Sequence, residues 1–366
     1  MDAVTKAYLI LTHVRGLGPR KTKLLVEHFG SAEAVLEAAR ADLLNVQGVG
    51  PSLAQAIVFA RESTWADEEG DRVERLGVKV VHYEHAAYPD SLRAIYDPPA
   101  LLYVRGELPG ALQELRAVGI VGTREASDYA LKLTEKLAVE LAEAGVTVVS
   151  GLALGVDSAA HRGAVKVSEG STVAVLGSGV DTIYPRQNSE LARKIWQGSG
   201  AVVSEYPLGT QPKPSNFPGR NRIINGFCKG VVVVEAGAKS GALITADYAA
   251  NEGRTVLAVP GRVGDPRSKG TLELLKQGAV LVQETGDVLQ ELGWNASPRS
   301  RVEKQVNLSA EQQSIADLVA ELGTPLLDDL VVTSKLDAPQ LLPLLTLLEL
   351  QSVVKKLPSG RYARVY

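Results

Sequence analysis

The residues best suited to binding chemistry lie in KPSNFPGRNRII, residues 213–224, where cations, amide side chains and one aromatic ring are interleaved. The surrounding stretch from Tyr206 to Val234 contains no Asp or Glu, although the chain has a net charge of -3. Its cations are Lys213, Arg220, Arg222 and Lys229. Cations beside an aromatic ring suit a phosphate backbone with unstacked bases. A solvated loop would explain the same charges, but the flanking turn residues and the buried strand that follows favour binding.

Composition indicates a folded protein of two or three domains, with 366 residues and 45% hydrophobic content. A single Cys228 excludes an internal disulfide, and the five His show no ligand spacing, so we expect neither a metal nor a cofactor. The N-terminal apolar run is short and is interrupted by Thr12 and His13, which predicts no membrane segment and a cytoplasmic protein. Because the chain as a whole is net acidic, a polyanion would have to bind at a local cationic patch.

The middle of the chain, between about Arg116 and Gly293, predicts an α/β doubly wound sheet. Short valine-rich runs alternate with helical segments: VGIVG, TVVSG, TVAVLG, AVVSEY, VVVVEA, TVLAVPG and AVLVQ. Most of the runs end in glycine or serine. Because ligands of open parallel sheets bind at the carboxyl ends of the strands, the expected crevice is lined by backbone amides and small hydroxyls, which suit oxyanions.

The first turn of this sheet argues against a dinucleotide site. GTREAS follows the first run in place of a G-x-G-x-x-G turn, and Ser150 stands where an acidic residue would hold a ribose. Arg124 in that loop instead indicates a phosphate ligand. A salt bridge from Arg124 to a neighbouring helix is the structural alternative.

The first 60 residues predict two helix-hairpin-helix units. Gly16 to Pro19 and Gly48 to Pro51 each precede a helical pattern, and such turns present free amides to phosphate oxygens at a helix start. Only the first hairpin is basic, through Arg15, Arg20, Lys21 and Lys23. Arg20, Lys21 and Lys23 are therefore a possible secondary DNA contact, although such hairpins also serve purely as packing units.

The C-terminal part predicts a polar linker followed by a winged-helix-like module. Ser309 and Gln312 form a capping box for a helix over 310–321, helices follow at about 326–336 and 338–351, and a hairpin turns at 358–360. The candidate recognition helix, 338–351, has no Lys or Arg, which is the wrong surface for a major groove. We expect a protein-contact or structural unit. Its cationic wing is a weaker DNA candidate: Lys355, Lys356, Arg361 and Arg364.

Five long central motifs, in order, resemble the DprA (Smf) family of DNA-processing proteins. They are Gly122-Thr123-Arg124, SGLALGVDSAAH, AVLGSGVDTIYPRQN, SEYPLGTQPKPSNFPGRNRIING and VVVVEAGAKSGALITADYA. The expected architecture is an extended Rossmann-like doubly wound sheet with a smaller domain on each side. The predicted boundaries are a helical SAM-like/helix-hairpin-helix domain over 1–70, a Rossmann-like DNA-binding domain over 71–294, a linker over 295–308 and a winged-helix-like domain over 309–366.

The resemblance implies a homodimer that binds single-stranded DNA without sequence preference and helps the RecA recombinase load on strands covered by single-strand binding protein, in natural transformation and recombination. It implies no catalysis. Lys213 lies one position farther from Phe217 than the family's basic residue. The expected DNA-binding residues, including the small residues at the strand ends, are Gly122, Thr123, Arg124, Ser150, Gly151, Lys213, Asn216, Phe217, Arg220, Asn221, Arg222, Ser240 and Gly241.

Two other classes of function compete with this interpretation. A similar sheet occurs in nucleotide-processing phosphoribohydrolases, and Asp157 with His161, four residues apart near a strand end, could be an acid and its orienting partner. Glu205 and Glu235 also end strands. However, AGAKSGALIT replaces the P-G-G-x-G-T loop of those enzymes, and an Asp near a helix start commonly caps it. The third class is an adaptor whose C-terminal module binds another protein.

Overall fold

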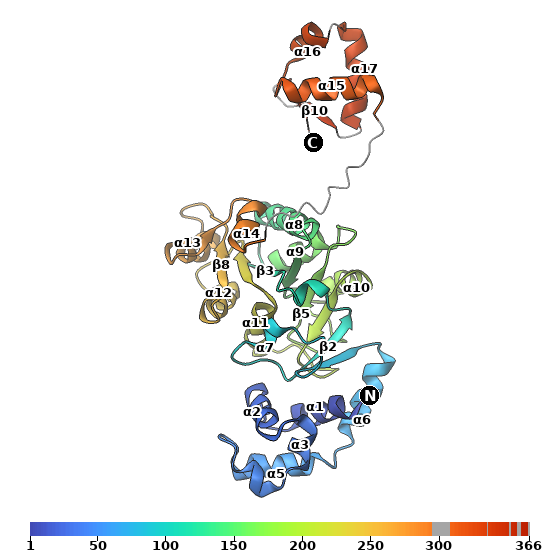
Figure 1. Cartoon of the computed structure of the whole chain (residues 1–366). Coiled ribbons are helices and arrows are strands. Elements are labelled where there is room, and N and C mark those ends of the chain that lie inside the picture. The colour runs from blue at the N-terminus through green and yellow to red at the C-terminus, as the bar shows by residue number, and fades with distance from the viewer. Residues whose placement is uncertain (295–307, 335, 351–352, 357–359, 365–366) are drawn as a thin grey trace. The chain divides into compact units, whose positions relative to one another are not determined.

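A computed structural model describes residues 1–294, 308–334, 336–350, 353–356 and 360–364. The chain forms two compact units, one within Met1–Arg299 and the other within Ser300–Tyr366 (Figure 1). The predicted linker over 295–308 lies outside the described residues except for Leu308, and so does most of the predicted turn at 358–360.

Six helices form the N-terminal region and contain the two predicted hairpins. The helices are α1 (Ala3–His13), α2 (Pro19–Phe29), α3 (Ala32–Glu37), α4 (Arg40–Leu43), α5 (Pro51–Ala60) and α6 (Trp65–Arg75). The two hairpins have matching geometry, because Gly16 and Gly48 adopt φ values of +87° and +84° and proline begins the helix that follows each turn. A left-handed backbone conformation favours glycine, and proline suits the first position of a helix.

A nine-stranded sheet forms the centre of the first unit, in the order β1-β2-β6-β5-β4-β3-β7-β8-β9. The strands are β1 (Lys79–His82), β2 (Leu101–Gly106), β3 (Ala117–Val121), β4 (Thr147–Ser150), β5 (Thr172–Val175), β6 (Ala201–Ser204), β7 (Gly230–Val233), β8 (Thr255–Ala258) and β9 (Val280–Leu281). The seven predicted strands, β3 to β9, are confirmed and pair in parallel. The prediction missed β1 and β2, which pair antiparallel and extend the sheet from β6.

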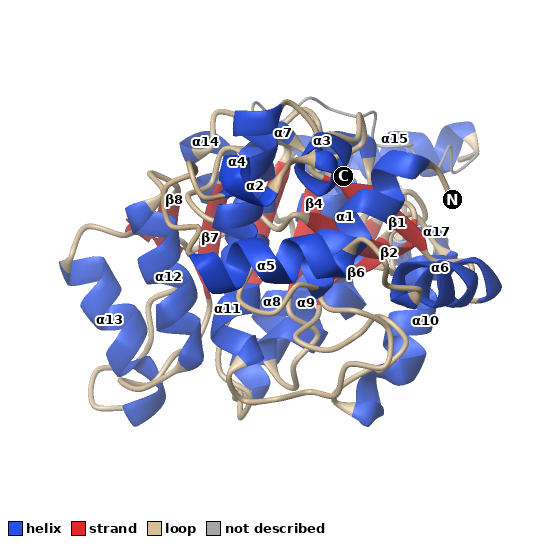
Figure 2. Cartoon of the chain, turned by 90° about the horizontal axis from the view of Figure 1, so that it is seen from below, coloured by secondary structure: helices blue, strands red, loops and turns tan. Residues whose placement is uncertain are grey.

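Helices cover both faces of this sheet, as Figure 2 shows. They are α7 (Asp90–Arg93), α8 (Asp128–Glu143), α9 (Val156–Ala164), α10 (Ser189–Gln197), α11 (Asn216–Phe227), α12 (Gly241–Asn251), α13 (Lys269–Lys276) and α14 (Thr285–Glu291), with short 3-10 turns η1 (Gly110–Leu112), η2 (Arg186–Asn188) and η3 (Pro266–Ser268). Helices α8 and α9 pack on one face of β3 and β4, and α11 packs on the other. Because both faces are covered, the parallel strands consist mostly of valine and other apolar residues.

The N-terminal helices and the sheet share one hydrophobic core. Tyr8, Leu25 and Ile57 of the helical region belong to the same buried cluster as Tyr103 and Leu176 of the sheet region. The buried Glu69 carboxylate of α6 also accepts a hydrogen bond from the Leu208 amide at 2.8 Å, and Arg72 pairs with Asp181 at 3.6 Å. The helical region is therefore fixed to the loops that follow β5 and β6.

The second unit contains three helices and a hairpin with a core of their own. Its elements are α15 (Ala310–Glu321), α16 (Leu327–Ser334), α17 (Ala338–Leu350), β10 (Val354–Lys356) and β11 (Tyr362–Arg364). The capping box of Ser309 and Gln312 is confirmed. Across the described ranges, no helix combines the length and apolar content needed to span a membrane.

Candidate nucleic-acid interface

A cavity of about 510 Å³ opens at the point where the strand order reverses. Strand β3 lies between β4 and β7, and the chain proceeds from β4 toward one edge and from β7 toward the other. Open α/β sheets bind ligands at such switch points, because the loops that leave the two neighbouring strands diverge. The loop after β3 and the N-terminal parts of α9, α11 and α12 line the cavity. We refer to this cavity and its lining as the cradle.

Arg124 and Phe217 meet at the cradle. The Arg124 guanidinium carbon lies 5.5 Å from the centre of the Phe217 ring, within range of a cation–π interaction. Among the described residues, Arg124 has no ion-pair partner, so the predicted alternative of a salt bridge to a helix is not realised. The Arg124 side chain is exposed, and its charge can meet a ligand.

The loop that carries Arg124 is held in place by Glu235 at the end of β7. The Thr123 amide donates to the Glu235 carbonyl at 2.7 Å, and the amide and hydroxyl of Ser127 donate to the Glu235 carboxylate at 2.8 and 2.9 Å. Gly122 is required here, because a Cβ would lie 2.9 Å from the Glu235 carbonyl oxygen and 2.5 Å from a Val156 methyl. Glu235 therefore orders the loop after β3 and is not part of the cradle lining.

Phe217 lies on the first turn of α11, on the helix face that lines the cradle. Phe217, Arg220, Asn221 and Ile224 share this face because they lie three, four and seven residues apart. Asn216 is not part of the lining; its side-chain amide donates to the Gly177 carbonyl at 2.9 Å and anchors the start of the helix. A Cβ at Gly177 would lie 3.1 Å from the Phe217 ring, so the ring packs closely on the loop after β5.

Arg220 forms part of the wall of the cradle and is largely committed to the protein. Its Nη1 donates to the carbonyls of Gly151, at 2.7 Å, and Val175, and its Nε donates to Asn221 Oδ1 at 3.2 Å. Burial lowers the pKa of Arg220 to about 10, and the charge of Asp157 opposes this shift. Only part of this guanidinium is available to a phosphate.

Ser150 and Gly151 lie beneath Arg220 and do not line the cavity. The Ser150 hydroxyl donates to the Ile120 carbonyl at 2.6 Å, and the Gly151 amide donates to Asp157 at 3.1 Å. Any Cβ at Gly151 would overlap the Arg220 guanidinium at 2.3 Å. The structure corrects the prediction that these two residues contact phosphate, because the Ser150 hydroxyl and the Gly151 amide already form hydrogen bonds within the fold.

Arg222 points away from the cradle, which corrects its expected role as a phosphate ligand. Its Nη1 and Nη2 each lie 2.7 Å from a Glu205 carboxylate oxygen, and its Nε lies 2.8 Å from the Asp97 carbonyl oxygen and 3.1 Å from the Asp97 carboxylate. Burial disfavours its charge, but Glu205 outweighs this effect and raises the pKa of Arg222. The guanidinium is a structural cross-link.

The N-terminus of α12 forms another part of the cradle lining. Ser240 caps the helix by accepting a hydrogen bond from the Ala242 amide at 3.3 Å, and a Cβ on Gly241 would meet no atom within 4 Å. The backbone of Gly241 is therefore open to an approaching ligand. Lys239, an exposed residue of the lining, was missed by the sequence analysis although it directly precedes Ser240.

The remaining predicted cations lie outside the cavity lining. Lys213 is exposed on the segment that leads into α11. The exposed Arg20 of the first hairpin lies over the Tyr96 ring at 4.6 Å. Lys23 lies 5.8 Å from the Tyr83 ring and 3.9 Å from Glu27. Lys21 is half-buried. The hairpin cations thus form a separate group.

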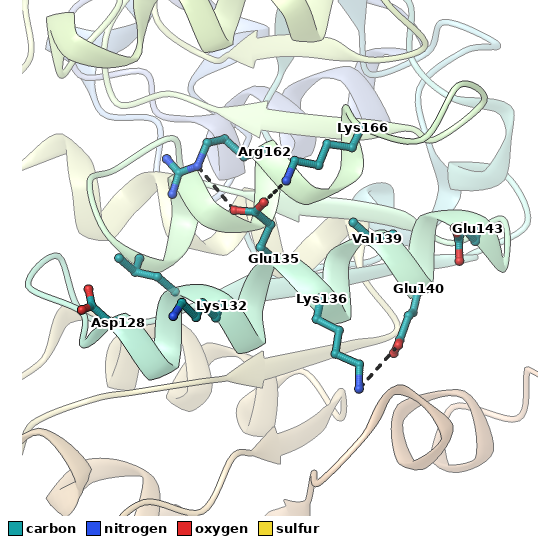
Figure 3. A pocket seen from close by; sticks show the side chains of 10 residues that line it. Asp128, Lys132, Glu135, Lys136, Val139, Glu140, Glu143, Arg162 and Lys166 are labelled. Atoms are coloured by element: carbon teal, nitrogen blue, oxygen red, sulfur yellow. Dashed lines mark hydrogen bonds and ion pairs between the residues drawn. The ribbon is translucent and has the colours of Figure 1, made fainter. Parts of the chain in front are cut away.

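A larger hollow, of about 660 Å³, lies over α8 and α9 and shares no lining residue with the cradle. Figure 3 shows that its charges face one another: Glu135 meets both Arg162 and Lys166, and Lys136 meets Glu140. Its four cations are matched by four carboxylates. Such a surface offers no net attraction to a polyanion, and the smaller cradle is the better candidate.

Two residues that an enzyme interpretation would use, His161 and Asp157, make hydrogen bonds within the fold, and Asp157 also lines the cradle. His161 is buried, its Nδ1 lies 2.7 Å from the Thr172 hydroxyl, and burial lowers its pKa to about 3. Asp157 accepts hydrogen bonds from the Gly151 and Ala153 amides, so it orders the loop after β4. In the part of the chain that the structure describes, no three His, Cys, Asp or Glu side chains gather as metal ligands would.

The fold and the cradle define an α/β protein with a Rossmann-like sheet, an amide-rich and cationic switch-point cavity, and an N-terminal tandem of helical hairpins. Comparison with known families agrees with this class. The sequence model described as DNA recombination-mediator protein A matches residues 79–293, and that of a SAM-like helix-hairpin-helix tandem matches residues 8–62. The chain belongs to the DprA (Smf) family of recombination-mediator proteins.

Individual relatives cover most of the chain. The chain is 36% identical over 348 residues to Protein Smf of Escherichia coli K12, covering 91% of this chain and 90% of that protein. It is similar to the X-ray structure of DprA from Streptococcus pneumoniae, with a TM-score of 0.69, 34% identity, and coverage of 80% of this chain and 99% of the other. DNA processing protein A of Helicobacter pylori, whose structure was solved for its single-stranded DNA binding mode, matches with a TM-score of 0.51 and 29% identity, covering 59% and 95%.

Proposed function

We propose that this chain is a sequence-independent single-stranded DNA-binding protein that promotes RecA loading in natural transformation and recombination. The observation that carries the proposal is the free Arg124 placed against Phe217 at the rim of the cradle. A cation neutralises a phosphate, while an aromatic ring stacks on any base, so the pair binds a flexible strand without reading its sequence. The family of recombination mediators and the Helicobacter relative support this choice of ligand.

The contacts divide into three kinds. Arg124 and Lys239 supply exposed positive charge, with Lys213 as an additional cation on the approach to α11. The turn at Ser240 to Gly241 presents open backbone close to a phosphate. Gly122 and Thr123 line the same cavity, with the Thr123 amide bonded to Glu235. Phe217 stacks on a base, assisted by the Asn221 and Arg220 side chains on the same helix face. A duplex presents no free base face to Phe217, so single strands are preferred.

The other parts have supporting roles in this proposal. The helical domain over 1–70 adds a secondary contact to DNA through Arg20, Lys21 and Lys23, and the domain over 309–366 makes protein contacts. Two copies of the 71–294 domain in a homodimer bind one strand at a high effective concentration, which raises the affinity of two small cradles. The protein acts without catalysis or a cofactor, and its partners are single-stranded DNA, RecA and single-strand binding protein.

Fluorescence anisotropy with a labelled oligothymidylate tests the binding. Arg124→Ala and Phe217→Ala should each weaken binding, the latter by about 1 to 3 kcal/mol, and Arg124→Ala should reduce the salt slope by about 0.7. Arg162→Ala is the matched control, because this exposed arginine lies in the charge-balanced hollow. Unchanged affinity in both cradle variants would reject the assignment.

Two further assays test the functions proposed beyond DNA binding, which are RecA loading and the absence of catalysis. RecA filament formation on DNA coated with single-strand binding protein should be stimulated by the parent and not by Arg124→Ala. Incubation with nucleoside monophosphates should release no free base. Turnover in that second assay would overthrow the non-catalytic proposal.

A further inference from the structure

A second aromatic ring lies beside the cradle and outside its lining. Tyr184 belongs to the loop between β5 and η2, and its ring centre lies 5.9 Å from that of Phe217 with the planes inclined by 41°. Tyr184 retains 44% of its accessible surface, and within the described residues its hydroxyl has no hydrogen-bond partner. The Tyr184 ring therefore contacts Phe217 while much of its surface remains open to a ligand.

The loop that carries Tyr184 is fixed relative to Phe217. The Gly179 amide donates to the Thr210 carbonyl at 2.9 Å, and the Ser178 hydroxyl donates to the Thr182 carbonyl at 2.7 Å. At the far end, the buried Asn188 side chain donates to the Leu152 carbonyl at 2.8 Å. One end of the loop is thus held by the loop after β6 and the other by the loop after β4, whose Ala153 lines the cradle. The Asn216 side chain also joins the start of α11 to the Gly177 carbonyl, so the spacing of the two rings does not depend on a ligand.

We infer that Tyr184 is a second stacking platform, which extends the binding track by one nucleotide beyond Phe217; this inference rests on the single-strand binding proposed above. A base inserted between the two rings would need about 7 Å, twice the spacing of stacked bases. The rings are closer than this and are inclined to each other. Each ring therefore stacks on a base of its own, and neighbouring bases must unstack partly to reach both.

A length series of oligothymidylates, about 4 to 20 nucleotides, tests the inference by anisotropy. Tyr184→Ala and Tyr184→Leu should each bind the longer oligonucleotides about 5- to 150-fold more weakly than the parent, and should reach their plateau of affinity at a shorter length. Tyr184→Phe should match the parent, because the ring carries the stacking. Leucine keeps an apolar side chain beside Phe217 without a π-face, so it separates stacking from simple support of Phe217. Phe59→Ala, which removes a ring from α5 that is 67% exposed and lies outside the cradle lining, is the control.

The outcomes are distinguishable from failure of the proposed function. A parent that binds no oligothymidylate would refute both proposals. A parent that binds, with Phe217→Ala weakened and Tyr184→Leu unchanged, would refute the role of Tyr184 alone. Loss of affinity in Tyr184→Phe equal to that in Tyr184→Ala would also overturn the inference, since the hydroxyl and not the ring would then be responsible.

Discussion

Arg222→Met should destabilise the protein, whereas Arg124→Met should change only its DNA binding. The Arg222 guanidinium forms a two-pronged pair with Glu205 at 2.7 Å for both bonds, and the Arg222 and Glu205 side chains are only 10% and 13% exposed. Its third nitrogen binds Asp97. Removing one partner of a buried pair leaves an uncompensated charge and costs about 3 to 5 kcal/mol.

That cost predicts a large change in thermal stability. At about 2 to 4 °C per kcal/mol for domains of this size, Arg222→Met should lower the melting temperature by about 6 to 20 °C. The double variant Arg222→Met with Glu205→Leu should recover most of the loss, because a buried ion pair can be replaced by apolar side chains at little cost. Arg124→Met, which removes an exposed and unpaired arginine, is the matched control and should melt with the parent.

Calorimetry and anisotropy on the same preparations distinguish a structural role from a DNA contact. If Arg222→Met melts at the temperature of the parent and loses single-strand affinity, the guanidinium contacts DNA and the argument from its hydrogen bonds is wrong. A double variant no more stable than Arg222→Met would show that Glu205 is not the origin of the cost.

The remaining predictions concern the buried charge beneath the cradle and the second unit. Burial raises the pKa of Asp157 and Arg220 opposes this shift, so Arg220→Met should raise that pKa further and destabilise the fold by about 3 to 5 kcal/mol near neutral pH. When the pKa of a carboxyl is higher in the folded state than in the unfolded state, its protonation favours the folded state. This contribution to the free energy of unfolding is complete below the unfolded pKa and is lost as the pH rises through the folded pKa. The deficit should therefore be smaller at about pH 5 than at about pH 8 in denaturant titrations; equal deficits would contradict it. Residues 1–294 alone should keep most of the single-strand affinity by anisotropy, and a large loss would assign DNA binding to the C-terminal unit.

The parallel sheet could be predicted from local sequence, but its antiparallel extension could not. Strands buried on both faces appear as valine-rich runs, and all seven such runs are strands. Strand β2 pairs with β1 across a gap of about 20 residues and with β6 across a gap of about 100 residues. The sequence of β2 itself does not specify either partner. Pairing at a sheet edge depends on tertiary contacts that a single run does not show.

The cradle was predicted in part, and the errors follow from an unrecognised helix. The composition of residues 213–224 predicts that every cation in this segment contacts the ligand, because composition does not show which side chains share a face. Most of this segment is helical in the structure, and Arg222, two residues after Arg220, turns away from the face that holds Phe217 and Ile224. Helical spacing from Phe217 would have separated the two arginines. Tyr184 carried no such signal, because its closeness to Phe217 depends on how two loops fold together.

The attachment of α6 to the sheet has a consequence for experiments on the N-terminal helices. Through Glu69 and Arg72, this helix holds the segments containing Leu208 and Asp181, and the latter segment leads to Tyr184. Truncating the helices would therefore loosen the loops after β5 and β6, including the loop that carries Tyr184, as well as removing the hairpin cations. Reduced DNA binding after such a deletion would not identify the hairpins as contacts; single substitutions at Arg20 or Lys21, which leave α6 in place, would be needed to decide.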